Sequence, residues 1–207
     1  MARAVLSADA LVDLALRLVD EGGPGALTLS AVAGAAGVAP PSLYKHVRNL
    51  AELRALVSVR VINEIADQVG EAVLGRSADE AVRALMTAWR AYVRRCPNRY
   101  AALIQTPEPR TAEAGARLLT IMTATLRAYG LEDSAAIHAS RCLRVAVHGF
   151  AVLEVEGAFG LPEDLEESYD LLIHMMTAGL HAPPARRSAP AARSVARTRA
   201  DGSAGAG

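Results

Sequence analysis

The chain has 207 residues, of which 52% are hydrophobic and only 4% aromatic, and its 22 lysine and arginine side chains balance 22 aspartates and glutamates. This length allows one large domain or two small ones, and a core built mainly from Ala, Leu and Val favours packed helices over sheets. Zero net charge excludes a uniformly basic chain, and the lack of an apolar run of about 18 residues predicts no membrane span.

The cysteines and the N-terminus suggest a cellular compartment. Cys96 and Cys142 stand in apolar helical segments and lack the CxxC spacing of a metal or redox site. Asp9 and Asp13 interrupt the apolar stretch that a signal peptide needs. We therefore expect a cytoplasmic protein with buried, reduced thiols.

The N-terminal segment predicts three helices. Residues 7–21 begin with a capping serine and repeat apolar side chains at spacings of three and four, as an amphipathic helix does. The Gly-Gly-Pro-Gly sequence at 22–25 ends this helix. A second helix is expected from Thr28 to Gly37. A third begins at Pro40, because proline is tolerated in the first turn of a helix.

The rest of the chain predicts longer helices that meet at glycines and prolines. Asn49 with Glu52, and Ser77 with Glu80, have the spacing of capping boxes and so mark two helix starts. The expected helices cover residues 50–74, 77–95, 98–105, 111–129, 134–156 and 163–180. From 182 to 207 the chain is rich in Ala, Pro, Arg, Ser and Gly, and we expect this tail to be disordered.

The second and third helices have the properties of a helix-turn-helix. Residues 28–60 hold Lys45 and three arginines against one glutamate, whereas acids outnumber arginines over 61–181. Leu43 and Val47 are expected to pack inward, which leaves a polar, cationic outer face suited to a DNA major groove. The alternative is an ordinary solvated surface, but the caps, the glycine turn and the charge together favour DNA. The candidate DNA-binding residues are Thr28, Ser30, Ser42, Tyr44, Lys45, His46 and Arg48.

Two sequence runs carry a resemblance to a known family. Ala-Gly-Ala-Ala-Gly-Val at 33–38 and Ser-Leu-Tyr-Lys-His-Val at 42–47 resemble the N-terminal domain of the tetracycline-repressor (TetR) family of bacterial regulators. The resemblance implies an all-helical homodimer with one helix-turn-helix per subunit and a C-terminal bundle that binds a small ligand. It also implies that Thr28 and Tyr44 hold phosphates, while Ser42, Lys45 and His46 line the groove.

This chain departs from the family pattern at two positions. Ala39 stands where the family often has Ser or Thr, so the third helix lacks its usual side-chain cap. Leu50 stands where the tetracycline repressor has a phosphate-contacting lysine, a contact that Arg48 could take over. The predicted fold is all-α, with about nine helices. We expect a three-helix DNA-binding domain over 1–50, a helical ligand-binding and dimerisation domain over 51–181, and the tail.

The C-terminal part carries a second resemblance and a predicted dimer interface. Residues 144–150 and 153–160 resemble a TetR subgroup with a Trp-His-Gly motif, although Val147 replaces the tryptophan. A glycine inside this helix is easiest to explain by close approach of another helix. We expect two apolar stripes to pair with their copies in a four-helix interface, although the subunit's own core could claim part of each. These residues are Ala146, Gly149, Phe150, Leu153, Tyr169, Leu172, Ile173, Met176 and Leu180.

A ligand pocket is expected between the C-terminal helices. Aromatic and methionine walls with one or two polar groups suit a small, mostly apolar molecule. Core packing is the commoner role for each of these side chains taken singly, and for His148 in particular. The predicted pocket residues are Met86, Trp89, Tyr92, Tyr100, Leu103, Met122 and His148.

The sequence therefore predicts a ligand-responsive transcriptional regulator. The favoured mode is a repressor that a small molecule releases from a palindromic operator. The alternatives are a TetR-like activator or a small-molecule-binding helical enzyme that uses residues such as His148 and Glu154. No catalytic or metal-ligand spacing is present, so we expect no enzyme activity, no metal and no cofactor. The expected partners are double-stranded operator DNA, the effector and a second copy of the chain, and not a membrane.

Overall fold

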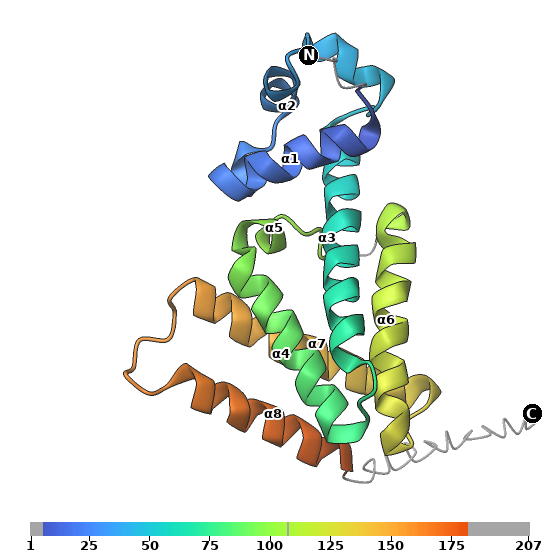
Figure 1. Cartoon of the computed structure of the whole chain (residues 1–207), viewed down its shortest axis with the longest axis vertical. Helices are drawn as coiled ribbons and strands as arrows, with labels where there is room; N and C mark the ends of the chain where they lie inside the picture. Colours follow the sequence, from blue (N-terminus) through green and yellow to red (C-terminus); the bar gives the residue numbers. More distant parts are fainter. Residues whose placement is uncertain (1–5, 107, 182–207) are drawn as a thin grey trace, which may run out of the picture.

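The computed structural model describes residues 6–106 and 108–181, and the predicted disordered tail lies outside them. Figure 1 shows a small N-terminal head above a larger helical body, with α3 running from one into the other. The head consists of α1 (Ala8–Gly22), η1 (Pro24–Ala26), α2 (Leu29–Ala36) and η2 (Pro40–Lys45). The body consists of α3 (Leu50–Val73), α4 (Ala78–Arg95), α5 (Pro97–Ala101), η3 (Pro109–Thr111), α6 (Ala112–Leu126), η4 (Arg127–Tyr129), α7 (Asp133–Val155) and α8 (Leu165–His181).

Local hydrogen bonds define the helix starts of the head. The Ser7 hydroxyl accepts from the backbone N–H of Ala10 at 3.1 Å, and the Thr28 hydroxyl accepts from that of Ala31 at the same distance. Gly37 ends α2 in the left-handed conformation at φ +65°, which glycine adopts without steric cost. The third helix of the head, η2, is a 3-10 helix that begins at Pro40, and no side chain caps it at Ala39.

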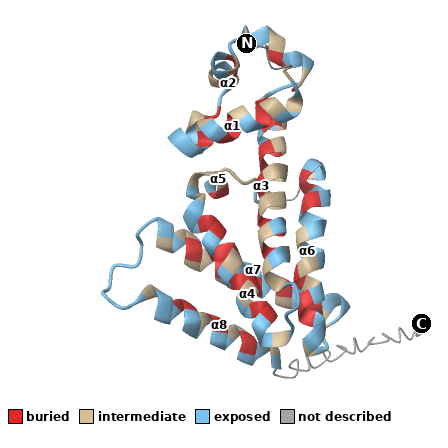
Figure 2. Ribbon diagram, in the orientation of Figure 1, coloured by how far each residue is buried: buried red, intermediate tan, exposed pale blue. Residues whose placement is uncertain are grey.

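The body is built around α3. This helix packs against α4 and α6, while α7 crosses α4 and α6, and α8 covers α4 and α7. Asn49 caps α3 by accepting from the backbone N–H of Glu52 at 2.8 Å. Figure 2 shows the buried residues following the inner faces of these helices. The fold is all-helical, as predicted, and the eight α-helices with η2 account for the nine helices expected in the described residues.

A buried arginine fixes the outer helices of the body to one another. Arg90 on α4 is only 4% exposed. Its guanidinium makes two hydrogen bonds of 2.7 Å to the Glu154 carboxylate on α7 and one of 2.7 Å to Glu166 on α8. It also lies over the rings of Phe150 and Tyr169, at 5.2 and 4.4 Å from their centroids. The Arg90 guanidinium balances the charge of the Glu154 carboxylate and occupies both of its oxygens. The enzyme alternative would have needed this carboxylate free to act on a substrate.

Two smaller predictions were wrong. Ser77 precedes α4, but its side chain makes no capping hydrogen bond, so the second capping box does not form. Cys142 is exposed on α7 and Cys96 is half-buried, because the helix face that carries Cys142 is turned away from the core. Within the described ranges, no helix combines the length and apolarity needed to cross a bilayer.

Candidate DNA-binding surface and ligand cavity

The predicted DNA-binding side chains gather on the outer surface of the head. Leu43 and Val47 are 0% and 1% exposed and hold η2 against the head, as the apolar pattern requires. Tyr44, between them, is 58% exposed. Thr28, Ser30, Lys45 and Arg48 are exposed as well, while Ser42 and His46 are half-buried. The 3-10 helix therefore presents a hydroxyl and an ammonium group to solvent from a rigid support.

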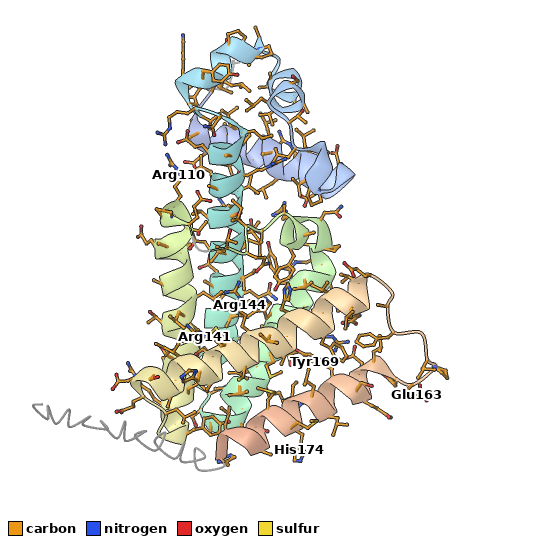
Figure 3. The ribbon with its side chains drawn as sticks, turned by 180° about the vertical axis from the view of Figure 1, so that it is seen from behind. Arg110, Arg141, Arg144, Glu163, Tyr169 and His174 are labelled. Carbon is orange, nitrogen blue, oxygen red and sulfur yellow. The ribbon has the colours of Figure 1, made fainter. Side chains whose placement is uncertain are left out.

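A carboxylate next to this surface joins two arginines from distant parts of the chain. Glu52 accepts from the backbone N–H of Arg48 at 2.7 Å and from its guanidinium at 3.1 Å. Its other oxygen is 2.5 Å from the guanidinium of Arg110 in η3. The backbone and side-chain hydrogen bonds from Arg48 lower the pKa of the Glu52 carboxyl, with a smaller contribution from Arg110. In Figure 3, Arg110 lies at the end of α6 that faces the head.

The sequence did not reveal where the Glu52 carboxylate lies. The spacing of Asn49 and Glu52 predicted that Glu52 would cap the helix start, and its amide does take the Asn49 cap. Its carboxylate, however, accepts from the N–H of Arg48 rather than that of Asn49. Arg110 carried no local signal, because its partner lies 58 positions earlier in the chain.

The body contains a cavity of about 680 Å³, within the usual size of small-molecule sites. Of the predicted pocket residues, Trp89, Tyr100, Leu103 and Met122 line it. Its walls come from α3, α4, α5, η3, α6, α7 and the segment between α5 and η3. They comprise Ile62, Ile65, Trp89, Tyr100, Leu103, Ile104, Gln105, Thr106, Glu108, Pro109, Thr111, Ala112, Gly115, Leu118, Leu119, Met122, Ile137, Ser140, Arg141 and Arg144.

Three predicted pocket residues lie outside the cavity wall. Met86 is fully buried, and its backbone carbonyl accepts from the Tyr169 hydroxyl at 2.7 Å. The Tyr92 hydroxyl donates to the Glu64 carboxylate at 2.7 Å, so this ring is directed toward α3. His148 lies behind the wall, where its Nδ1 shares a hydrogen bond of 3.0 Å with the Tyr100 hydroxyl.

The environment of this pair shifts both pKa values. Burial lowers the pKa of the His148 imidazole, and the positive charge of Arg144 lowers it further. Burial raises the pKa of the Tyr100 hydroxyl, against smaller opposing effects of Trp89 and Arg144. Near neutral pH, a protonated phenol therefore lines the cavity and a neutral imidazole lies behind it.

The cavity also has polar groups that the sequence did not reveal as pocket residues. Ser140, Arg141 and Arg144 line it from α7, and Gln105 lines it from the segment after α5. Arg144 donates to the Gln105 side chain at 2.9 Å. A signal for them existed in the i, i+4 spacing of Ser140 and Arg144, which places both on one helix face.

The predicted dimer stripes differ in their burial within one subunit. Tyr169 and Ile173 are 2% and 1% exposed and belong to the interior of their own subunit, which is the alternative that the sequence left open for part of each stripe. Phe150 packs against the rings of Phe159 and Tyr169, 5.0 and 4.8 Å away. The other predicted residues are half-buried, namely Ala146, Gly149, Leu172, Met176 and Leu180, except Leu153, which is 44% exposed.

A neighbouring apolar face of α7 and α8 is open to solvent. Val145 is 70% exposed, Leu171 59% and Met175 61%. No atom lies within 4 Å of where a Cβ on Gly149 would be, within the part of the chain that the structure describes. The close approach that this glycine predicts is therefore not made by another described helix of the same subunit.

The described residues bring together no set of histidine, cysteine, aspartate and glutamate that could hold a metal ion. A helix-turn-helix head joined by one continuous helix to a hollow helical body defines a DNA-binding transcriptional regulator. Residues 11–55 match the family described as bacterial regulatory proteins, tetR family, and residues 82–176 match the tetracyclin repressor-like C-terminal domain.

Two curated relatives extend over most of the chain. It is 34% identical to the HTH-type transcriptional regulator YobS of Bacillus subtilis, over 82% of this chain and 90% of the relative. It is 35% identical to the HTH-type transcriptional regulator Rv0681 of Mycobacterium tuberculosis, over 74% of this chain and 72% of the relative. The chain belongs to the TetR family of transcriptional regulators. It binds DNA through its head and is not an enzyme.

The fold is shared with solved structures of the same family. The transcriptional regulator SCO7222, a TetR from Streptomyces coelicolor, matches with a TM-score of 0.68 and 19% sequence identity. The match covers 86% of this chain and 98% of that one. At this identity the likeness establishes the fold.

Proposed function

We propose that this regulator is a homodimeric repressor that a small molecule entering the body cavity releases from its operator. The observation that carries the proposal is the course of α3. This helix begins at Leu50, directly below the head, and farther along it lines the cavity through Ile62 and Ile65. A ligand that displaces α3 in the body can transmit this movement along the helix to Leu50, where α3 meets the head.

The ion pairs of Glu52 supply a second connection between cavity and head. Arg110 belongs to η3, whose other two residues, Pro109 and Thr111, line the cavity. Its partner Glu52 also pairs with Arg48, which follows η2 in the chain. A ligand that reorders η3 therefore changes the position or the pairing of a candidate phosphate contact. It shifts the equilibrium only by its difference in affinity for the two arrangements.

The open apolar face of α7 and α8 supports a homodimer. Val145, Leu171 and Met175 form an exposed surface that a twofold copy of the same helices can cover. Such a dimer presents two copies of η2 to DNA half-sites one helical turn apart, ~34–36 Å. The start of α3 at Leu50, after the end of η2, supports a boundary at residue 50 between the DNA-binding and ligand-binding domains. His148 and Gly149 support a place in the Trp-His-Gly subgroup.

The first test is operator selection from random duplex DNA, followed by mobility shifts at several salt concentrations. Lys45→Ala should weaken operator binding and reduce the slope of log affinity against log salt by about one unit, since one phosphate contact is lost. Arg127→Ala removes a positive charge from η4 on the body and should leave both quantities unchanged. Equal effects of the two variants would contradict the assigned reading surface.

A reporter gene under the selected operator decides the sign of regulation. Deleting the regulator should raise expression if it represses, and a fall would instead assign an activator. Screening compounds for release of the operator then tests the ligand response. If no compound changes operator affinity while the cavity is shown to bind one, the ligand-controlled mechanism fails.

A further inference from the structure

We propose that the effector is an amphipathic acid, an apolar molecule with one carboxylate, whose charged end is bound by Arg144 and Ser140. The inference rests on the proposed function in one respect, because it treats the cavity as the effector site. It goes further by assigning the chemical class of the ligand and the groups that select it.

One buried polar group of the cavity wall has no hydrogen-bond partner. Ser140 is 3% exposed, and its Oγ makes no hydrogen bond to any other described group. The Trp89 indole N–H is directed at the Tyr100 hydroxyl, whose pKa it lowers, so it is not counted with the serine. Buried polar groups are nearly always satisfied, and a serine hydroxyl can donate, so this free hydroxyl on the cavity wall indicates a bound acceptor. An apolar molecule without oxygen would leave the hydroxyl unpaired.

The same wall carries positive charge that lacks a counter-ion. Arg141 and Arg144 line the cavity from α7, and no carboxylate pairs with either of them within residues 6–106 and 108–181. Arg144 has only the neutral Gln105 side chain as a partner. Arg90 and Arg117 meet acidic partners on neighbouring helices, whereas Arg141 and Arg144 are exposed and, like Arg95 and Arg127 among the described residues, meet none. The two cavity arginines are thus available to an anion.

Ser140 and Arg144 lie on the face of α7 that lines the cavity. Ser140 and Arg144 are four residues apart on α7, the spacing that brings side chains together. In Figure 3, Arg141 and Arg144 lie close together along α7 on the side of the body where it crosses α3 and α6. The charge of Arg144 also reaches the groups behind the wall, since it lowers the pKa of His148. The His148 imidazole therefore stays neutral, and the positive charge that attracts an anion comes from Arg141 and Arg144.

The remaining wall determines the rest of the ligand. Glu108 is the one carboxylate among the lining residues, and it belongs to the segment that leads into η3 rather than to α7. Most other contacts are apolar, from Ile62, Ile65, Leu118, Leu119, Met122 and Ile137. A polyanion would have to desolvate its additional charges against these side chains, and a cation would meet two arginines. One carboxylate on an apolar body satisfies both parts of the wall.

Isothermal titration calorimetry of the full chain with decanoate, methyl decanoate and decylamine tests this assignment. Decanoate should bind at least tenfold more tightly than the ester or the amine. Trp89, the only tryptophan, should report the same binding through its fluorescence. Equal affinity for acid and ester, or no binding of the acid, would overturn the proposal.

Variants separate the role of charge from that of folding. Arg144→Gln should remove the preference for acid over ester, and Ser140→Ala should reduce it, with unchanged circular dichroism. Arg127→Gln, an exposed arginine on η4, should bind decanoate as the unmodified chain does. If Arg144→Gln keeps the full preference, the arginine is not the anion site and the proposal fails.

Operator release distinguishes this inference from the proposed function. If decanoate binds through Arg144 but operator affinity does not change, the ligand class stands and the ligand-controlled mechanism fails. If a neutral compound releases the operator and Arg144→Gln responds to it normally, the mechanism stands and the acid assignment fails.

Discussion

The head and the body of this regulator display their functional groups in opposite directions. In the head, Tyr44 and Lys45 point outward from a helix fixed by its own neighbours, and the caps join residues three positions apart. In the body, the polar groups of interest point inward. There, contacts such as Arg90 to Glu154 join residues 64 positions apart, and Tyr169 reaches the carbonyl of Met86 across 83 positions.

This difference decides how each region tolerates change. A DNA-reading surface needs a rigid support and exposed side chains, so short segments can build it. A cavity exists only while several helices keep their spacing, and its shape depends on contacts that fix those helices to one another. A surface substitution in the head should alter one contact with DNA, whereas loss of a buried contact in the body should alter the whole domain.

Removing the buried arginine should give the largest effect on stability. Arg90→Ala leaves Glu154 without its bidentate partner in a half-buried site, and breaking a buried ion pair in this way costs about 3–5 kcal/mol. Urea unfolding followed by circular dichroism measures the loss. Arg94→Ala removes a half-exposed arginine from the same cluster and should cost less than about 1 kcal/mol. Equal losses for the two variants would mean that the cluster does not fix the body.

Placing a charge on the open face of the body should break the dimer without unfolding the subunit. Met175→Glu introduces a carboxylate at a position that is 61% exposed in one subunit and would be covered in the dimer. Sedimentation should then give a monomer, and operator affinity should fall at least 100-fold because two half-sites are no longer bound together. Leu74→Glu, at a 74% exposed site beyond the end of α3, is the matched control. A Met175→Glu chain that remains dimeric would locate the interface elsewhere.

The sequence predicted the head more completely than the body. In the head, Ser7 and Thr28 cap their helices as predicted, because a cap is a contact between near neighbours that any short window of sequence contains. Most helix bounds of the body were close to those observed, since glycines and prolines mark the ends. The helix expected over 98–105 is the exception, because α5 ends at Ala101. The polar lining of the cavity was missed. The spacing of Ser140 and Arg144 marks one helix face, but only the fold brings that face together with Gln105, 39 positions from Arg144, on the cavity wall.

Helical periodicity identifies a buried face but not what covers it. Met86, Trp89 and Tyr92 recur along one side of α4 and are all buried, yet only Trp89 meets the cavity. On α8, Tyr169 and Ile173 pack into the core of their own subunit. A second apolar pair, Leu171 and Met175, remains exposed. Hydrophobicity alone does not distinguish a stripe that meets its own chain from one that meets a partner.

The connection between the two regions can be weakened without destroying either. Glu52→Gln keeps an acceptor for the Arg48 backbone N–H but loses the charge that attracts the Arg48 and Arg110 guanidinium groups. Operator affinity in the absence of ligand should change less than threefold. The ratio of affinities with and without decanoate should fall about three- to tenfold, the size of a modest coupling free energy. Glu71→Gln, an exposed glutamate near the end of α3, should leave the ratio unchanged, and an unchanged ratio in Glu52→Gln would exclude this route.

The smallest expected effect concerns pH and again separates buried from exposed groups. The lowered pKa of His148 means that the folded chain binds this proton less readily than the unfolded chain, whose histidine titrates near 6.5. Stability from the neutral imidazole is therefore complete above about pH 6.5 and declines as the pH falls toward the lower folded pKa.

Carboxyls with lowered pKa values, such as Glu52 and Glu166, lose their contribution only below their usual value of 4.5, so the two pH ranges are distinct. Urea unfolding between pH 7 and pH 5 should show a decline that His148→Asn reduces. His138→Asn, on the exposed side of the same helix, should preserve it. An identical pH profile for both variants would mean that the imidazole behind the cavity wall does not resist protonation in the folded chain.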